Sequence, residues 1–518
     1  MLKVYDSYSA DITDFIPIEE NKVKMYVCGP TVYDKAHLGH ARCYITWDMV
    51  YRYLKFSGYD VKYCRNVTDV DDKILKKAED QKKTVEEISS TYYESFKASM
   101  EKLNLLSPDI EPFATKCIKD MIEIIEKLIE KGYAYEADGD VYFQVNKFKD
   151  YGKLSKQPLE DLSSGIRVEL SDKKRGNLDF ALWKRDEKHG YESPWGKGRP
   201  GWHIECSAMS KKYLGSTIDI HAGGADLIFP HHENELAQSE CANDCKFVKY
   251  WLHNGFVTIN NQKMSKSLAN FVTIDDLLQT YDANTIRFFI LTNNYRMPIE
   301  FNDQALIAAS NGVKRIKNSI ISASEKFFDF YKVKDNTELL KKFGFITESD
   351  LNLSKLELFS KGKLTKKDLK EIYDGVEIND FIIAMDDDFN TSKALAVIFS
   401  LVDKVNKSLL DGNYDNVKKS VSILIILCSI LGLDFTTNNT AENEIEKKLL
   451  KVVDKFSFLS KEDKNLPFSD IMDIILNKRT EARSNKDYKT ADNIRDILKA
   501  AGIVIKDTKD GAKIELLD

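Results

Sequence analysis

The sequence has few features of a secreted or membrane protein. Its eight cysteines are scattered over 518 residues, unlike the dense spacing of a disulfide framework. The longest apolar run, residues 421–433, is too short to span a bilayer and is typical of a buried helix. The first 14 residues contain three aspartates and no apolar core, so we expect no secretory signal peptide. These absences predict a cytoplasmic protein with no membrane attachment.

The sequence also lacks an excess of positive charge, and its second half lacks histidine. The 76 lysines and arginines face 82 aspartates and glutamates, and the net charge of −6 argues against non-specific binding to bulk nucleic acid. All eight histidines lie between His37 and His253, so any histidine chemistry belongs to the N-terminal half. The length exceeds that of a single core and predicts more than one domain.

The N-terminal segment predicts the start of a parallel sheet. A strand, a helix with one apolar face and a second strand follow one another between residues 24 and 67, as in a β-α-β unit. In such sheets ligands bind where strands end, against helix N-termini. His37 and His40 lie at that position, and Gly39 would let a phosphate chain approach closely.

Three carboxylates, Asp69, Asp71 and Asp72, follow the second strand. Carboxylate oxygens are suitable ligands for Mg²⁺. Alternatively, Asp69 or Asp71 caps the helix that comes next. The pattern alone is compatible with both interpretations.

A second half-sheet is predicted after residue 200. Residues 201–206 have the pattern of a strand, and another apolar strand begins at Ile218 and ends in Gly223 and Gly224, with Asp226 beyond. The glycines would admit a ribose whose hydroxyls donate to Asp226. A tight turn would have the same Gly-Gly pair.

The stretch Phe229-Pro230-His231-His232-Glu233-Asn234-Glu235 predicts a helix start with ligand-type side chains. Proline is favoured in the first turn of a helix, and positions i and i+4 share a face. His231 and Glu235 can therefore point at one metal ion that needs two further ligands. A surface ion pair would have the same pattern. His232 is assigned no ligand role.

A short loop of Lys263-Met264-Ser265-Lys266-Ser267 follows a strand predicted over residues 256–259. Its two lysines and two serines suit the binding of an anion, with a solvated turn as the alternative. From residue 275 onward the pattern is mainly helical. The tail from residue 471 carries ten lysines and arginines, as would an RNA-contacting module or a solvated helix surface.

Together these segments resemble the class I aminoacyl-tRNA synthetases, and among them the cysteinyl-tRNA synthetase family. The HIGH-type element corresponds to residues 30–40, with Leu38 in the isoleucine position, and the KMSKS element is intact at residues 263–267. Further segments are similar to this one specificity, namely residues 28–34, 201–209, 229–238, 381–391 and 481–502.

The resemblance implies an α/β fold: a split Rossmann-like parallel-sheet catalytic domain with an insertion, followed by an α-helical bundle and a small C-terminal anticodon-binding module. We expect the first half of the catalytic domain in 1–130, the connective insertion in 131–200, the second half with the zinc site and KMSKS loop in 201–310, the helical anticodon-stem-binding domain in 311–437 and the anticodon-binding module in 438–518. The chain is longer than the usual pattern over about 327–379, and this extension is assigned no role.

In this family two cysteines, a histidine and a glutamate hold one zinc ion, and the matching residues are Cys28, Cys206, His231 and Glu235. The residues themselves support this set, because Cys28 and Cys206 each end a predicted strand, at the edge where the His231 helix begins. Two thiolates, an imidazole and a carboxylate form a suitable Zn²⁺ shell. The other cysteines are expected to serve packing only.

The resemblance further implies a ligase that converts ATP to AMP and pyrophosphate. L-cysteine would be activated to cysteinyl-adenylate and transferred to the 3′ end of tRNA(Cys), with Mg²⁺ accompanying ATP and the zinc selecting the substrate thiol. A monomer is expected. The implied roles are phosphate binding and catalysis by His37, His40, Lys263 and Lys266, nucleotide binding by Gly39, Gly223, Gly224, Asp226 and Lys266, and substrate contact by Thr68 and Trp202.

Two other functions fit parts of the sequence. An ATP-dependent cysteine ligase of the same fold that acylates a small amine would lack the anticodon module, so residues 380–518 argue against it. A zinc-containing RNA-binding protein without enzymatic activity would not need the phosphate-binding elements at residues 30–40 and 263–267.

Overall fold

The structure is a computed structural model that divides into two units. The described part of the first unit lies between Met1 and Asp434, and that of the second between Phe435 and Leu516. The described residues are 1–157, 173–259, 262–263, 271–327, 365–372, 375–435, 448–449, 452–460, 463–465, 468–508 and 511–516.

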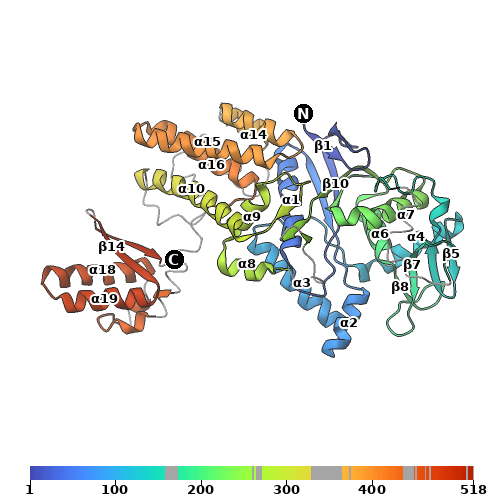
Figure 1. The fold of residues 1–518 in the computed structure, drawn as a ribbon, viewed down its shortest axis with the longest axis horizontal. Coiled ribbons are helices and arrows are strands. Elements are labelled where there is room, and N and C mark those ends of the chain that lie inside the picture. Colours follow the sequence, from blue (N-terminus) through green and yellow to red (C-terminus); the bar gives the residue numbers. More distant parts are fainter. Residues whose placement is uncertain are drawn as a thin grey trace. The chain divides into compact units, whose positions relative to one another are not determined.

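A four-stranded parallel sheet forms the centre of the first unit (Figure 1). Its strand order is β10 (Val248–Asn254), β9 (Ile218–Gly224), β3 (Lys22–Val27) and β4 (Asp60–Arg65). β3 pairs with β9 although the whole connective segment separates them in the sequence. The prediction of a split parallel sheet is therefore confirmed.

Helices surround this sheet. α1 (Leu38–Phe56) connects β3 to β4 and is buried along most of its length. After β4 the chain forms α2 (Asp72–Gln81), α3 (Val85–Lys102) and α4 (Ile118–Glu130). Asp71 is the N-cap of α2 and accepts a hydrogen bond from the Lys73 amide. The capping interpretation of this acidic cluster is thus correct for Asp71.

The connective segment is an antiparallel sheet of β5 (Ala134–Ala137), β6 (Asp140–Phe143), β7 (Phe180–Arg185) and β8 (Gly198–Pro200). In Figure 1 it lies at one end of the first unit, beside α4, α6 (Trp202–Leu214) and α7 (Glu233–Asn243). Its last strand, β8, ends at Pro200, and α6 begins two residues later at Trp202.

One predicted strand is wrong. Residues 201–206, expected to be an apolar strand, form the start of α6. An exposed helix would show a polar face, but seven consecutive residues from Ile204 to Ser210 are buried. Because burial surrounds the helix, the periodicity that distinguishes a helix from a short strand is lost.

The remaining elements of the first unit complete the sheet edge and build a helical bundle. A small sheet contains β11 (Val257–Ile259), β12 (Gln262–Lys263) and β13 (Ile299–Glu300), and β1 (Lys3–Asp6) pairs with β2 (Asp11–Asp14). The helices are α8 (Ile274–Thr280), α9 (Ala283–Leu291), α10 (Asp303–Phe327), α13 (Lys366–Ile372), α14 (Val376–Asp386), α15 (Thr391–Leu410) and α16 (Tyr414–Ile430). The apolar run at residues 421–433 lies mostly in α16 and is buried, as predicted.

The second unit has its own hydrophobic core. Its elements are α18 (Phe468–Ser484), α19 (Tyr488–Ala500), β14 (Ile503–Thr508) and β15 (Gly511–Leu516), the two strands being antiparallel. Ile475, Ile494, Leu498 and Ile503 are at most 1% exposed within this core. A core of this kind can hold the unit together without contacts from elsewhere.

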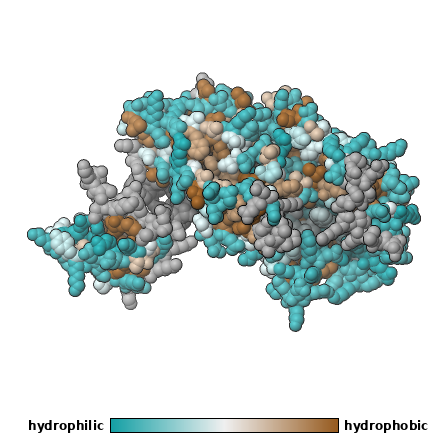
Figure 2. All heavy atoms as spheres, viewed as in Figure 1, coloured by the Kyte–Doolittle hydropathy of each residue, from teal (hydrophilic) through white to brown (hydrophobic). Residues whose placement is uncertain are grey.

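Hydrophilic residues cover most of the surface seen in Figure 2, where hydrophobic residues form scattered patches. Among the described residues, no helix is both long and apolar enough to cross a membrane.

Candidate functional site

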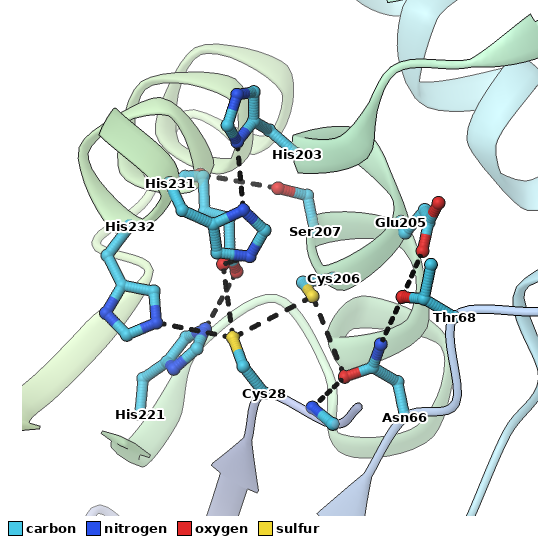
Figure 3. A network of polar contacts seen from close by, with 12 residues as sticks. Cys28, Asn66, Thr68, His203, Glu205, Cys206, Ser207, His221, His231 and His232 are labelled. Atoms are coloured by element: carbon cyan, nitrogen blue, oxygen red, sulfur yellow. Dashed lines mark hydrogen bonds and ion pairs between the residues drawn. The ribbon is translucent and has the colours of Figure 1, made fainter. Parts of the chain in front are cut away.

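All four predicted metal ligands meet in one buried cluster (Figure 3). One ligand atom from each of Cys28, Cys206, His231 and Glu235 lies within 4.8 Å of the others, and all four residues are buried. The two sulfur atoms are 3.9 Å apart, and Cys28 Sγ lies 3.6 Å from Glu235 Oε1. This donor set and its compactness fit a tetrahedral Zn²⁺ ion.

Cys28 is held in place by the end of β3. Its amide donates to the Ala222 carbonyl of β9 over 3.2 Å, which continues the pairing of the two half-sheets. A Cβ at Gly29 would lie 1.4 Å from the Asn66 carbonyl oxygen, so only glycine fits after Cys28. The close approach of these two segments brings the Cys28 sulfur to the carboxyl edge of the sheet, as predicted.

Cys206 reaches the same point from a helix. It lies in the second turn of α6 and is 3% exposed. The expectation that Cys206 ends a strand is therefore wrong, although its thiol does arrive beside Cys28. The reason is that α6 packs against α7, so a helical residue meets the sheet edge there.

His231 and Glu235 form the predicted i, i+4 pair, with 2.8 Å between Nε2 and Oε1. His231 lies in a short π-helical turn, Ile228–His232, and Glu235 lies in the first turn of α7. His203 Nδ1 contacts His231 Nδ1 at 2.9 Å, and His221 Nε2 contacts Glu235 Oε2 at 2.7 Å. These outer contacts leave His231 Nε2 and Glu235 Oε1 facing the two thiols.

The electrostatics of the cluster favour the charged forms of three ligands, Glu235, His231 and Cys206. Burial alone would raise the pKa of Glu235, but His221 and His231 outweigh it and lower this pKa to about 2. Burial would lower the pKa of His231, but Glu235 outweighs it and raises this pKa to about 10. A hydrogen bond from Cys28 lowers the pKa of Cys206 to about 6, whereas burial raises the pKa of Cys28. A carboxylate and a thiolate are therefore favoured, as metal binding requires, whereas the imidazolium of His231 has to lose a proton before its nitrogen can bind a metal.

Sequence reasoning missed three neighbours of this cluster, His203, His221 and His232. Cys28, His221, His232 and Glu235 offer a second set of ligand atoms within 4.8 Å of one another. His232, which was assigned no ligand role, is fully buried, with Nε2 3.3 Å from Cys28 Sγ and Nδ1 2.7 Å from His253 Nε2. The confinement of all histidines to one half of the sequence was the only signal for this grouping.

A cavity of about 340 Å³ opens beside the cluster. His37 is the N-cap of α1, and its ring stacks on that of His40 with 3.9 Å between centroids. The positive end of the α1 dipole therefore faces a space suited to an anion. The predicted site residues that line this cavity are Cys28, His37, Gly39, His40, Trp202, Gly224 and Asp226.

Other predicted residues lie near this cavity or outside the described part of the chain. Thr68 is buried and hydrogen-bonded to Glu205, and a Cβ at Gly223 would meet the His232 ring at 3.0 Å. The backbone of Lys263 ends β12, paired with Thr258. Lys266 lies outside the described residues.

Trp202 covers the donor cluster on its cavity side. Its ring packs on the His231 ring with 4.3 Å between centroids, and the side chain lines the cavity. Trp202 is 43% exposed. An aromatic plane at this point separates the metal-binding atoms from solvent.

Three family models match successive parts of the chain. Residues 14–311 match the class I (C) tRNA synthetase catalytic domain. Residues 380–436 match the DALR domain, and residues 468–514 match the cysteinyl-tRNA ligase anticodon-binding domain.

Solved structures share the fold at low sequence identity. A Mycobacterium tuberculosis methionyl-tRNA synthetase in complex with methionyl-adenylate has a TM-score of 0.53 at 14% identity, over 83% of this chain and 94% of its own. A leucyl-tRNA synthetase from Agrobacterium radiobacter in a ternary complex has a TM-score of 0.54 at 11% identity, over 81% and 85%.

Curated relatives are similar over nearly the whole length. The cysteine–tRNA ligase of Geobacter sulfurreducens is 45% identical over 516 residues, covering 98% of both chains. That of Clostridioides difficile is 42% identical over 515 residues, covering 99% of both. With this full-length identity, a matching catalytic domain and a buried Cys-Cys-His-Glu cluster, the chain belongs to the cysteine–tRNA ligase family of class I aminoacyl-tRNA synthetases.

Proposed function

We propose that this protein activates L-cysteine with ATP and transfers the cysteinyl group to the 3′ end of tRNA(Cys). The observation that carries the proposal is the buried donor cluster of Cys28, Cys206, His231 and Glu235 beside a cavity lined by the HIGH-type element. Membership of the family supports the same activity.

The donor cluster is proposed to select the substrate. Cysteine and serine differ by one atom, and an apolar pocket discriminates such small differences by only about 1–3 kcal/mol. Bound to these four residues, a zinc ion would supply a Lewis acid with a strong preference for thiolate over hydroxyl. His203 and His221 orient the two non-sulfur ligands from behind.

The cavity is proposed to hold ATP, with Mg²⁺ accompanying its phosphates. His37 and His40 at the start of α1, with Gly39 between them, would bind phosphate oxygens. Gly224 and Asp226 line the other side, where Asp226 can accept from ribose hydroxyls, and Gly223 keeps β9 close to His232. Lys263 and Lys266 would stabilise the β- and γ-phosphates.

The two chemical steps need no covalent enzyme intermediate. The cysteine carboxylate attacks the α-phosphorus of ATP, and pyrophosphate leaves. The terminal hydroxyl of the tRNA then attacks the carbonyl carbon of the adenylate, and AMP leaves. The protein contributes positioning and charge stabilisation, which together account for large rate enhancements.

Cysteine-dependent ATP–pyrophosphate exchange tests this function. We expect exchange with cysteine, far less with serine, and loss of the cysteine reaction after zinc is removed by a chelator, with recovery when zinc is added back. Exchange that is indifferent to the amino acid would contradict the proposal. Aminoacylation of tRNA(Cys) distinguishes the proposed function from that of a ligase that acylates a small amine. Light scattering of the purified protein tests the expected monomer.

A further inference from the structure

One buried arginine joins the helix of the HIGH-type element to the turn that follows α9. Arg42 lies in α1, two positions after His40, and is 1% exposed. Its Nη1 donates to the Ile290 carbonyl over 2.8 Å. Its Nη2 lies 2.9–3.1 Å from three further carbonyl oxygens, those of Asn294, Tyr295 and Met297. The guanidinium therefore holds the end of α9 and the turn over residues 292–297 against α1, and α1 and α9 pack together (Figure 1).

The same turn supports one segment of the cavity lining. The Tyr295 carbonyl accepts from the Gly255 amide over 2.8 Å as well as from Arg42. A Cβ at Gly255 would clash with the Met297 carbonyl group, so only glycine permits this close approach. Residues 254–257 line the cavity. The position of this part of the lining therefore depends on the turn that Arg42 holds.

ATP in the cavity would touch both segments. His37 and His40, at the start of α1, are the residues proposed to bind its phosphates. Asn254 pairs in register with Gly224 at the ends of β10 and β9, so residues 254–257 continue from the side proposed for the ribose. A ligand that is held at two places binds tightly only when the distance between those places matches its own length.

We propose that Arg42 is a positioning residue for ATP, which sets the distance between the phosphate-binding start of α1 and the nucleoside-side lining at residues 254–257. Both of its Nη groups are engaged by carbonyl oxygens, so it acts through the backbone that it binds. A guanidinium suits this task because its donors are spread over a rigid plane. This inference rests on the proposed function.

Two buried arginines allow a matched test. Arg42→Lys keeps the positive charge but has a single nitrogen, which cannot reach all four carbonyl oxygens. Arg287→Lys is the control, because the Arg287 side chain is also fully buried and donates to the Leu103 and Leu431 carbonyls over 3.1 and 3.0 Å. In the described part of the chain, Arg287 does not line the cavity. Both variants are to be assayed at a temperature where their unfolding curves show the folded state.

We expect Arg42→Lys to raise the KM for ATP in pyrophosphate exchange about 10- to 100-fold, the effect of a misplacement of about 1 Å. The KM for cysteine stays near the wild-type value, because the donor cluster belongs to other elements, the end of β3 with α6 and α7. Arg287→Lys leaves both KM values near those of the wild type. An unchanged KM for ATP in Arg42→Lys, or an equal rise in Arg287→Lys, overturns the inference.

Binding of the two halves of ATP shows whether the distance between the two sides has changed. Adenosine would meet only the nucleoside side, and inorganic tripolyphosphate only the phosphate side. Calorimetric titration without cysteine compares both compounds with ATP. In Arg42→Lys we expect weaker binding of ATP and unchanged binding of adenosine and tripolyphosphate. Equal weakening of ATP and of either half would place the damage within one side of the cavity and would overturn the inference.

Gly255→Ala tests the same attachment from the other side, and it decides the matter if Arg42→Lys does not fold. The added Cβ would push residues 254–257 away from the Met297 carbonyl. The KM for ATP should therefore rise in this variant too, and the KM for cysteine should not. A wild-type KM for ATP in folded Gly255→Ala overturns the inference. Absence of cysteine-dependent exchange in the wild type would instead overturn the proposed function.

Discussion

The sulfur atoms of Cys28 and Cys206 lie 3.9 Å apart although 178 positions separate the two residues in the chain. Cys28 follows β3 of the first half-sheet, and Cys206 comes from α6, after the connective sheet. Neither half of the catalytic fold contains the donor cluster alone. A metal bound there would hold the two halves together.

Replacing Cys206 by serine is expected to abolish both zinc binding and cysteine activation. A hydroxyl is a much poorer zinc ligand than a thiolate, and the lowered pKa of Cys206 shows that its thiolate is favoured at this point. Metal analysis of the purified protein and pyrophosphate exchange measure the two effects. Cys245→Ser, at a partly exposed position outside the cluster, serves as the control. Full activity of Cys206→Ser without bound metal would refute the assignment of the site.

Removal of zinc is expected to lower the thermal stability of the protein. A ligand that binds only the folded state stabilises it, and this one would connect segments from both half-sheets. Thermal unfolding with and without a chelator measures the difference in Tm. The chelator should leave the Tm of Cys206→Ser unchanged, because that variant has no zinc to lose. An equal fall in the Tm of the wild type and of Cys206→Ser would mean that the chelator acts at a place other than the donor cluster.

Lys266→Ala is expected to slow pyrophosphate exchange about 10²- to 10³-fold, the cost of removing one donor that stabilises transition-state charge. The lysine is assigned from the KMSKS element and lies outside the described residues. Lys249→Ala, on β10, is a control lysine away from the cavity. Activity of Lys266→Ala close to that of the wild type would remove this lysine from phosphate stabilisation.

Asp48→Asn is expected to destabilise the first unit by about 3–5 kcal/mol, because it leaves a buried cation without its anionic partner. Asp48 Oδ2 pairs with Arg287 Nη2 of α9 at 2.6 Å, and the Arg287 side chain is fully buried. Denaturant unfolding measures the loss of stability.

Asp403→Asn is the control, because it removes the same type of partner from Arg315 on the surface, where Asp403 is 65% exposed and Arg315 is 51% exposed. That control should change stability by about 1 kcal/mol or less. Similar losses in both variants would contradict the importance of burial.

Truncation after Asp434 is expected to preserve cysteine activation and to impair tRNA charging. Every described residue of the donor cluster and the cavity lies in the first unit, and the second unit has its own hydrophobic core. Pyrophosphate exchange and aminoacylation of tRNA(Cys) are to be measured on the same preparation. Loss of exchange in a truncated protein that still unfolds cooperatively would show that activation depends on residues 435–518.

The sequence predicted those site residues whose signals are local. The strand before Cys28 has a clear pattern, the i, i+4 spacing of His231 and Glu235 places both on one helix face, and Asp71 caps the next helix. The strand predicted at residues 201–206 failed because α6 is buried on nearly all sides, which removes the polar face that reveals a helix.

The sequence by itself determined the split parallel sheet and the family and predicted the four candidate metal ligands, because each of these depends on residue types at short spacings or on matches along the chain. Only the tertiary structure decided that His203, His221 and His232 surround the candidate ligands, and that hydrogen bonds link Asn66, Thr68 and Glu205. These groups come from the segment after β4, from β9, from α6 and from the turn before α7, and no local pattern connects them. Their contacts exist because the pairing of β3 with β9 and the packing of α6 against α7 bring distant polar groups into one interior, where each must find a partner.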